Sequence, residues 1–242
     1  MARRALKSRS RKPEIRGRHV GVVVAAGGRG ARLPGDVPKQ FLLLHRMPIL
    51  LHSLRTFEEI SSVREIVIVV PADQVRRTDE MLRRWRPRKV SHVVVGGSER
   101  QHSVRNGLLS FDEEPEIVLV HDAVRPLVSK KIIVKVIDES RKHGAAVVGV
   151  RVKDTIKVEE RGFYRKTLDR SKLWAVQTPQ GFRYDVLMKA HLASQRTSFI
   201  GTDEASLVER LRIPVRVVEG DDRNLKITTK ADLRLAEMLL KS

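Results

Sequence analysis

Continuous apolar runs alternate with amphipathic segments along the first part of the chain. The apolar runs predict buried strands, because a strand covered on both faces of a sheet shows no polar alternation. The segments between them carry apolar residues at helical spacing and predict helices. The predicted strands are residues 20–26, 65–70, 90–95, 117–120 and 145–150, and the predicted helices are residues 48–59, 73–85, 98–109 and 129–143.

This alternation predicts an α/β fold with a mostly parallel, twisted sheet and helices on both of its faces. In such a sheet the ligand site lies beyond the C-terminal ends of the strands. Three polar segments follow strand ends: the glycine-rich stretch after residue 26, the pair Gly96 and Gly97, and the pair His121 and Asp122. Their agreement predicts one site at that edge.

The pattern changes after residue 150. Residues 155–169 are polar and roughly alternating around Arg161 and Gly162, which predicts a long β-hairpin. A polar hairpin without a covering face is marginal alone, so we expect this arm to pack on a second subunit. The remaining predicted elements are helices at 183–193, 202–211 and 229–240, the last with Thr229 as N-cap, and a strand at 215–218.

No internal repeat or linker is visible. We therefore predict a basic, disordered N-terminal tail at residues 1–18 and a single domain at residues 19–242. The β-arm of that domain, at about residues 151–170, is expected to serve dimerisation.

The charge balance favours anionic partners. The chain has 48 Lys and Arg against 29 Asp and Glu, a formal charge of +19, which suits nucleotides, phosphorylated metabolites or nucleic acid. Residues 1–18 hold eight basic residues and one acidic residue, as a solvated arm does. Because only 4% of residues are aromatic, few platforms exist for stacking single strands. A nucleic-acid-binding protein is thus the less favoured class, with such binding expected only through the tail.

Cysteine is absent, so disulfides and thiolate metal sites are excluded and a reducing, cytoplasmic location is expected. No apolar run approaches the roughly 20 residues of a membrane span, and none near the N-terminus resembles a secretory signal. We expect no membrane association.

The glycine-rich stretch AAGGRGARLPGDVPKQ follows the first predicted strand. Glycine lets backbone N–H groups approach an anion closely, and Arg29, Arg32 and Lys39 add full positive charges, so a polyphosphate site is predicted. The spacing matches neither the dinucleotide fingerprint nor a Walker loop. Fixed cations over a phosphate chain suit phosphoryl or nucleotidyl transfer. The alternative is a glycine turn with solvated basic residues.

Two further constellations lie at strand ends. Asp122 could hold Mg²⁺ against nucleotide phosphates, because Mg²⁺ takes one or two carboxylates together with phosphate and water. Arg125 could pair with Asp122 or with phosphate, or the pair could merely cap a turn. Gly96, Gly97 and Ser103 could receive a base, or form an ordinary strand-to-helix turn. The histidines show no metal-ligand spacing.

With these residues in view, the chain resembles the 2-C-methyl-D-erythritol 4-phosphate cytidylyltransferases of the non-mevalonate isoprenoid pathway. The motifs run in order from about Val20 to the C-terminus. They are Ala25-Ala26-Gly27 through Arg32 to Pro38-Lys39-Gln40, Gly96-Gly97-x-x-Arg100-x-x-Ser103-Val104, Val120-His121-Asp122-Ala123-Val124-Arg125-Pro126, Asp154-Thr155, Asp169-Arg170-x-x-Leu173-Trp174, Gln177-Thr178-Pro179-Gln180, Thr202-Asp203-Glu204-Ala205-Ser206 and Asn224-x-Lys226-Ile227-Thr228.

The resemblance implies a Rossmann-like nucleotidyltransferase fold and a homodimer joined by interlocked β-arms. It implies the reaction of CTP with 2-C-methyl-D-erythritol 4-phosphate, with Mg²⁺ or another divalent cation, by in-line attack of the acceptor phosphate on the CTP α-phosphate. The products would be 4-diphosphocytidyl-2-C-methyl-D-erythritol and pyrophosphate. Ribitol-5-phosphate cytidylyltransferases share most of these motifs and remain the alternative.

Roles carried over by motif fall into three groups. The catalytic residues would be Arg32, Lys39 and Lys226. The nucleotide would be held by Ala25, Ala26, Gly27, Gly28, Gly30, Gly96, Gly97, Arg100, Ser103, Asp122 and Ala123. The acceptor would be held by Asp122, Arg125, Thr155, Arg170, Thr178 and Thr202, with Asp122 also serving the metal.

Three features depart from the family pattern. The glycine loop has one residue more before Arg32, Val124 stands where Ala or Ser is usual, and the tail at 1–18 has no counterpart. Which glycine meets the phosphates is therefore left open, but no charged candidate is removed.

Overall fold

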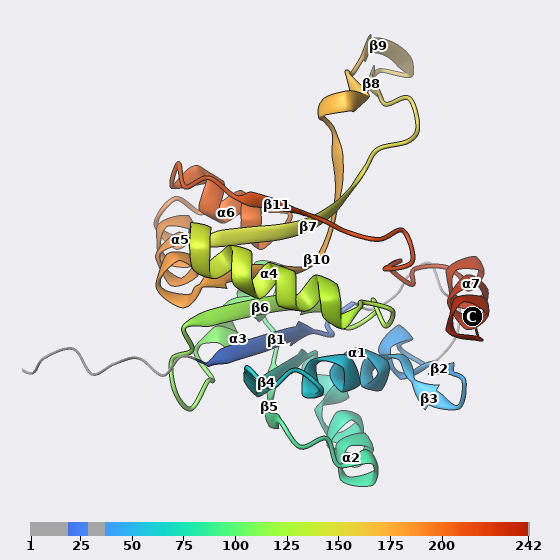
Figure 1. Ribbon diagram of the computed structural model, residues 1–242, viewed down its shortest axis with the longest axis vertical. Coiled ribbons are helices and arrows are strands. Elements are labelled where there is room, and N and C mark those ends of the chain that lie inside the picture. The colour runs from blue at the N-terminus through green and yellow to red at the C-terminus, as the bar shows by residue number, and fades with distance from the viewer. Residues whose placement is uncertain (1–18, 29–36, 242) are drawn as a thin grey trace, which may run out of the picture.

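The computed structural model describes residues 19–28 and 37–241, and its centre is a seven-stranded sheet. The strand order is β11-β7-β10-β6-β1-β4-β5 (Figure 1). All neighbours are parallel except β10, which runs antiparallel to both β6 and β7. The strands are β1 (Val20–Ala25), β4 (Val63–Val70), β5 (Val90–Val95), β6 (Ile117–Asp122), β7 (Ala145–Arg151), β10 (Trp174–Arg183) and β11 (Arg216–Glu219).

Helices cover both faces of this sheet, which confirms the predicted α/β class. Side chains of β1 alternate between the two layers: Val22 and Val24 pack into one core cluster and Val23 into the other. The first cluster is completed by α1 (Ile49–Glu58), α2 (Val75–Trp85) and α4 (Lys130–His143). The second is completed by α3 (Arg100–Leu108), α5 (Tyr184–Arg196) and α6 (Glu204–Arg210).

A third, smaller cluster joins the C-terminal helix α7 (Lys230–Lys241) to the short strand β2 (Leu43–Leu44), which pairs with β3 (Met47–Pro48). Thr229 caps α7 as predicted, because its Oγ1 accepts a hydrogen bond from the Asp232 backbone N–H at 3.2 Å. The same helix is the red element beside the blue β2–β3 hairpin in Figure 1. This cluster packs the C-terminal helix against residues near the start of the described chain.

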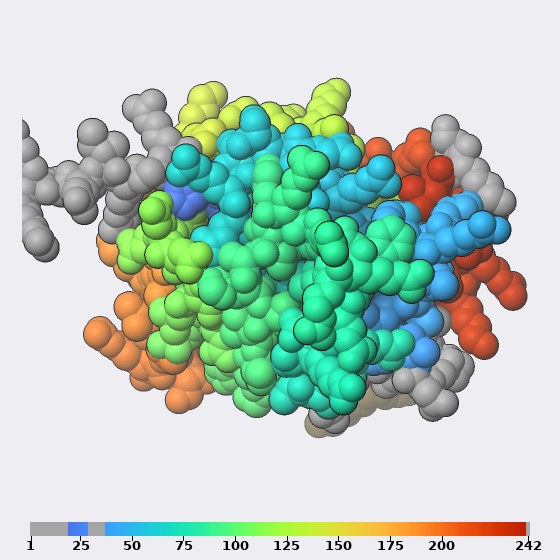
Figure 2. Space-filling model, turned by 90° about the horizontal axis from the view of Figure 1, so that it is seen from below, coloured from blue at the N-terminus to red at the C-terminus, as the bar shows by residue number. Residues whose placement is uncertain are grey.

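Figure 2 shows the molecule from below, on the face that carries α2. The segments from α1 through α3 form a continuous layer on this face. No helix within the described ranges is long and apolar enough to cross a membrane.

The central strand β10 is absent from the sequence-based prediction, which placed no strand between residues 170 and 183. The polar residues Gln177, Thr178 and Gln180, together with Pro179, interrupt its apolar pattern. The structure places these polar side chains in the interior, where Gln177, Thr178 and Gln180 are all buried. The ladder to β7 is interrupted between Val176 and Gln180, so the proline falls where the pairing is already broken.

The predicted hairpin is present as β8 (Lys157–Glu160) and β9 (Phe163–Thr167), which project from the body of the molecule (Figure 1). Its turn residues Arg161 and Gly162 have φ of 52° and 83°. Both values are the left-handed conformation that a tight hairpin turn requires, and glycine adopts it without strain. Every residue of β8 and β9 is exposed, so the body of the described chain leaves this arm uncovered.

Candidate active site

A cavity of about 550 Å³ opens at the C-terminal ends of β1, β4, β5 and β6. The three polar segments that the sequence placed at strand ends meet there. The cavity is lined by Ala25, Ala26, Gly27, Gly28, Lys39, Gln40, Pro71, Gly96, Gly97, Ser98, Glu99, Arg100, Ser103, Asp122, Val124, Lys226 and Thr228.

Several predicted site residues lie outside this lining. Ala123 and Thr178 are buried behind it, and Arg125 packs beside Asp122. Thr155 and Arg170 are exposed at the base of the arm, and Thr202 is exposed just before α6. Gly30 and Arg32, like the tail at residues 1–18, lie outside the described residues.

Asp122 is the centre of charge in the cavity. Its Oδ2 lies 2.7 Å from Lys226 Nζ and 3.7 Å from Arg125 Nε, and its Oδ1 lies 3.4 Å from Arg100 Nη2. Burial alone would raise the pKa of Asp122, but these cations outweigh it and hold the pKa at about 2. The carboxylate is therefore ionised at any physiological pH and fixes three basic side chains around the cavity.

A hydrogen-bond chain behind Asp122 holds its backbone. His121 Nε2 lies 3.1 Å from the Arg125 carbonyl oxygen, which can only accept, so Nε2 carries the proton. His121 Nδ1 then accepts from Thr178 Oγ1 at 3.1 Å, and the same oxygen accepts from the Asp122 N–H at 3.0 Å. Burial lowers the pKa of His121 to about 4, which keeps the ring neutral as this chain requires.

Arg100 is held from its other side by Glu204, which the sequence analysis did not assign to the site. Arg100 Nη1 donates to Glu204 Oε2 at 2.6 Å, and the Glu204 side chain is 1% exposed. Gln180 of β10 accepts from the backbone N–H of Glu204 at 3.2 Å and donates to Asp203 at 2.7 Å. The Thr202-Asp203-Glu204 motif is the sequence signal that could have pointed to Glu204.

Lys226 reaches the cavity on a loop held by Asn224. The Asn224 amide is fully buried and donates to the Thr178 carbonyl oxygen at 2.9 Å and to Gln177 Oε1 at 3.0 Å. The Asn224 carbonyl oxygen accepts from Arg125 Nη1 at 2.7 Å. The interrupted stretch of β10 therefore anchors the loop that brings Lys226 to Asp122.

The glycine segments are shaped by side chains beside them. Gln40 Nε2, in the same short 3₁₀ turn as Lys39, donates to the Ala26 carbonyl oxygen at 2.8 Å. Ser103 Oγ accepts from the Gly97 N–H at 3.1 Å. A Cβ atom on Gly97 would lie 2.4 Å from the His102 Cβ, so only glycine fits where the chain enters α3.

The comparisons with known proteins agree with this geometry. The family model described as IspD, 2-C-methyl-D-erythritol 4-phosphate cytidylyltransferase, matches residues 20–242. The chain belongs to this family. A family member from Geobacillus kaustophilus is 46% identical over 220 residues, which cover 91% of this chain and 96% of that protein.

Solved structures of family members share the fold. The crystal structure of 4-diphosphocytidyl-2C-methyl-D-erythritol synthase from Anaerococcus prevotii superposes with a TM-score of 0.81 at 28% identity, covering 93% of this chain and 97% of that one. The crystal structure of 2-C-methyl-D-erythritol 4-phosphate cytidylyltransferase from Thermus thermophilus gives a TM-score of 0.75 at 32% identity, covering 93% and 100%. The predicted Rossmann-like nucleotidyltransferase fold is thus confirmed.

The cavity fits a divalent cation only in company with a polyanion. Within the described part of the chain, Asp122 and Glu99 are the carboxylates that line it, and both Asp122 oxygens already face cationic side chains. Mg²⁺ is commonly held by one or two carboxylates together with substrate phosphates and water. This donor set is consistent with Mg²⁺ that takes most of its ligands from a nucleotide.

Proposed function

We propose that this protein transfers the cytidylyl group of CTP to the phosphate of 2-C-methyl-D-erythritol 4-phosphate, in isoprenoid biosynthesis. The observation that carries the proposal is the cavity that Gly27, Gly28, Lys39 and Lys226 line together with the buried carboxylate of Asp122. Family membership supports the choice of both substrates.

The chemistry needs positioning and charge compensation and no general base. An oxygen of the acceptor phosphate is already anionic and attacks the α-phosphorus of CTP in line. One P–O bond forms, the bond to the β-phosphate breaks, and pyrophosphate leaves with the bonding electrons. Lys39 and Lys226, together with Arg32 outside the described residues, stabilise the negative charge that grows on the α-phosphate oxygens.

We assign the nucleotide to the strand ends and the acceptor to the side of the arm. Gly96, Gly97, Arg100 and Ser103 hold the cytidine part, and the backbone of the glycine loop holds the phosphates. Acceptor contacts fall to Asp122, Arg125, Thr155, Arg170 and Thr202, and the motif adds Thr178. Thr178 is buried with its hydroxyl already bonded, so its part is to position Asp122.

Mg²⁺ would complete the proposed site, held by the Asp122 carboxylate together with the phosphates of the nucleotide. The ion supplies further neutralisation of the triphosphate when bound. The cytoplasmic location expected from the cysteine-free composition, and any nucleic-acid contact through the tail, remain predictions.

Pyrophosphate release tests the proposed function. With CTP and Mg²⁺ we expect release with 2-C-methyl-D-erythritol 4-phosphate, and little with ribitol 5-phosphate or when ATP, GTP or UTP replaces CTP. Release only with ribitol 5-phosphate would support the nucleotide site but show that the acceptor is ribitol 5-phosphate. No release with any pair from folded protein would contradict the assignment.

We also propose that two copies of the chain pair through their β-arms, so that Thr155 and Arg170 serve the partner's cavity. The support is the exposure of apolar side chains on the arm: Phe163 is 67% exposed and Tyr164 is 77% exposed. A two-stranded hairpin with such a surface is marginal without a partner.

A charge at the arm tests this pairing. We expect Phe163→Glu to weaken the dimer at least tenfold, measured by sedimentation velocity across a dilution series, because burying a carboxylate in an apolar contact is costly. Val134→Glu is the matched control, since Val134 is 44% exposed on α4, away from the arm. A monomeric wild type, or equal effects of the two variants, would contradict the proposed pairing.

A further inference from the structure

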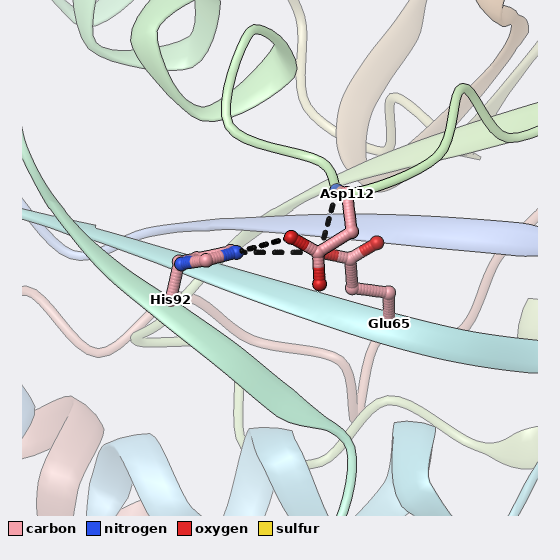
Figure 3. A group of neighbouring side chains, drawn as sticks. All are labelled: Glu65, His92 and Asp112. Carbon is pink, nitrogen blue, oxygen red and sulfur yellow. Dashed lines mark hydrogen bonds and ion pairs between the residues drawn. The ribbon is translucent and has the colours of Figure 1, made fainter.

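Three possible metal ligands meet at the end of the sheet opposite the cavity. Glu65 lies near the start of β4, His92 lies in β5, and Asp112 lies in the loop after α3. Figure 3 shows their side chains pointing toward one another, and one ligand atom from each lies within 4.8 Å of the others. His92 Nε2 is 3.0 Å from Asp112 Oδ1 and 4.0 Å from Glu65 Oε1.

The carboxylates of this cluster share their cavity with Arg64, Arg88 and Lys89 but form no ion pair with them. Glu65 is 8% exposed, and its Oε1 accepts from Ser91 Oγ at 2.6 Å and from the Asp112 N–H at 3.2 Å. Within the described ranges, neither Glu65 nor Asp112 forms an ion pair with a lysine or arginine, and His92 is the ionisable side chain that each contacts. With His92 in its neutral form, the carboxylate of Glu65 is a nearly buried negative charge without an ion pair. Buried charges are normally paired or bound to a metal.

A second observation points into the same place. His19 is 5% exposed, and its buried Nδ1 has no hydrogen-bond partner among the described residues. His19 lines a cavity of about 280 Å³ together with Glu65 and Asp112. A buried imidazole nitrogen without a hydrogen-bond partner therefore belongs to a residue that shares this cavity with two of the three ligands.

We propose that Glu65, His92 and Asp112 bind a zinc-type divalent cation, with His19 beside them as a further nitrogen donor. Ligand atoms about 2.1 Å from a tetrahedral ion lie about 3.4 Å apart, and the observed 3.0 and 4.0 Å bracket that value. Imidazole mixed with carboxylate suits Zn²⁺, whereas Mg²⁺ prefers oxygen alone. Positions 65, 92 and 112 match no short metal motif, so the sequence does not predict this site.

The bound ion would serve structure, because the cluster lies at the other end of the strands from the reaction. It would join β4, β5 and the loop after α3, and so clamp one edge of the sheet. An ion that binds the folded chain but not the unfolded chain would raise the melting temperature by mass action.

Zinc binding to the metal-free full chain, without nucleotide or Mg²⁺, tests the site. We expect one tight site by calorimetry, a rise in melting temperature with one equivalent of Zn²⁺, and tetrahedral absorption bands with Co²⁺. His92→Ala and Asp112→Asn should each lower the Zn²⁺ affinity on the order of 100-fold. These side chains are 42% and 72% exposed, so both variants should fold.

His143→Ala is the matched control, since this histidine pairs with Glu139 on the surface of α4 at 3.3 Å. It should leave Zn²⁺ affinity unchanged. The proposal is overturned if the wild type binds no Zn²⁺ at micromolar concentration. It is also overturned if His92→Ala and Asp112→Asn bind as the wild type does, or if His143→Ala loses as much affinity as they do.

Discussion

Lys39→Ala is expected to lower kcat by about 100- to 1,000-fold, the loss typical of removing one group that stabilises charge in a transition state. Lys39 lines the cavity at the start of a short 3₁₀ turn, beside Gln40, which donates a hydrogen bond to the Ala26 carbonyl oxygen. Because the negative charge on the α-phosphate grows as the acceptor attacks, KM for CTP should change far less than kcat. Steady-state pyrophosphate release with both substrates varied separates the two parameters.

Lys135→Ala provides the control, because Lys135 is an exposed lysine on α4 and lies outside the cavity lining. It should keep wild-type kinetics, and both variants should keep the wild-type circular dichroism spectrum. A Lys39→Ala enzyme with near-normal kcat, or with its whole loss in KM for CTP, would argue against the assigned role.

Asp122→Asn is expected to damage both stability and turnover. The substitution keeps the shape of the side chain but removes the charge that faces Arg100, Arg125 and Lys226. Removing one partner of a buried ion pair typically costs 3–5 kcal/mol; we expect about 3 kcal/mol here, since Lys226 is 43% exposed and Arg100 keeps Glu204. Turnover should fall on the order of 100-fold, because Lys226 loses the contact that orients it.

Denaturant unfolding and pyrophosphate release measure the two effects on the same sample. Asp138→Asn is the control, since Asp138 is 65% exposed in its pairing with Arg141 on α4. Exposed pairs contribute at most about 1 kcal/mol, so this variant should behave as wild type. Equal unfolding free energies for the two variants would mean that Asp122 does not organise the cations.

The sheet could be predicted where burial on both faces made the sequence uniformly apolar. The predicted strand at 117–120 lies within β6, in which every residue is buried. The predicted helix at 129–143 ends at Gly144, whose φ is 87°. The strand β10 could not be found this way. Its polar side chains are buried because they bind other parts of the fold, and nothing local in the sequence records those partners.

Some residues of the site could likewise be predicted from the sequence, and others could not. Lys39, Asp122 and the glycine pair at 96 and 97 could be placed from strand ends, since parallel strands bring their ends to one edge. Glu204 could not, because its importance lies in a contact with Arg100 across more than a hundred positions of sequence. Partnerships of that kind appear only when the sheet has been assembled.

The arm leaves and re-enters the sheet at one place, so the length of the arm does not affect the register of the sheet. Arg151 at the end of β7 is the register partner of Trp174 at the start of β10, so the residues between them form a closed excursion. The entropy cost of such a loop grows slowly with its length. Insertions or deletions in the arm therefore need not shift the pairing of β7 with β10 or disturb the anchor of Lys226. The length of the hairpin tip, between Thr155 and Arg170, can therefore vary over evolution while the sheet that carries the cavity stays as it is.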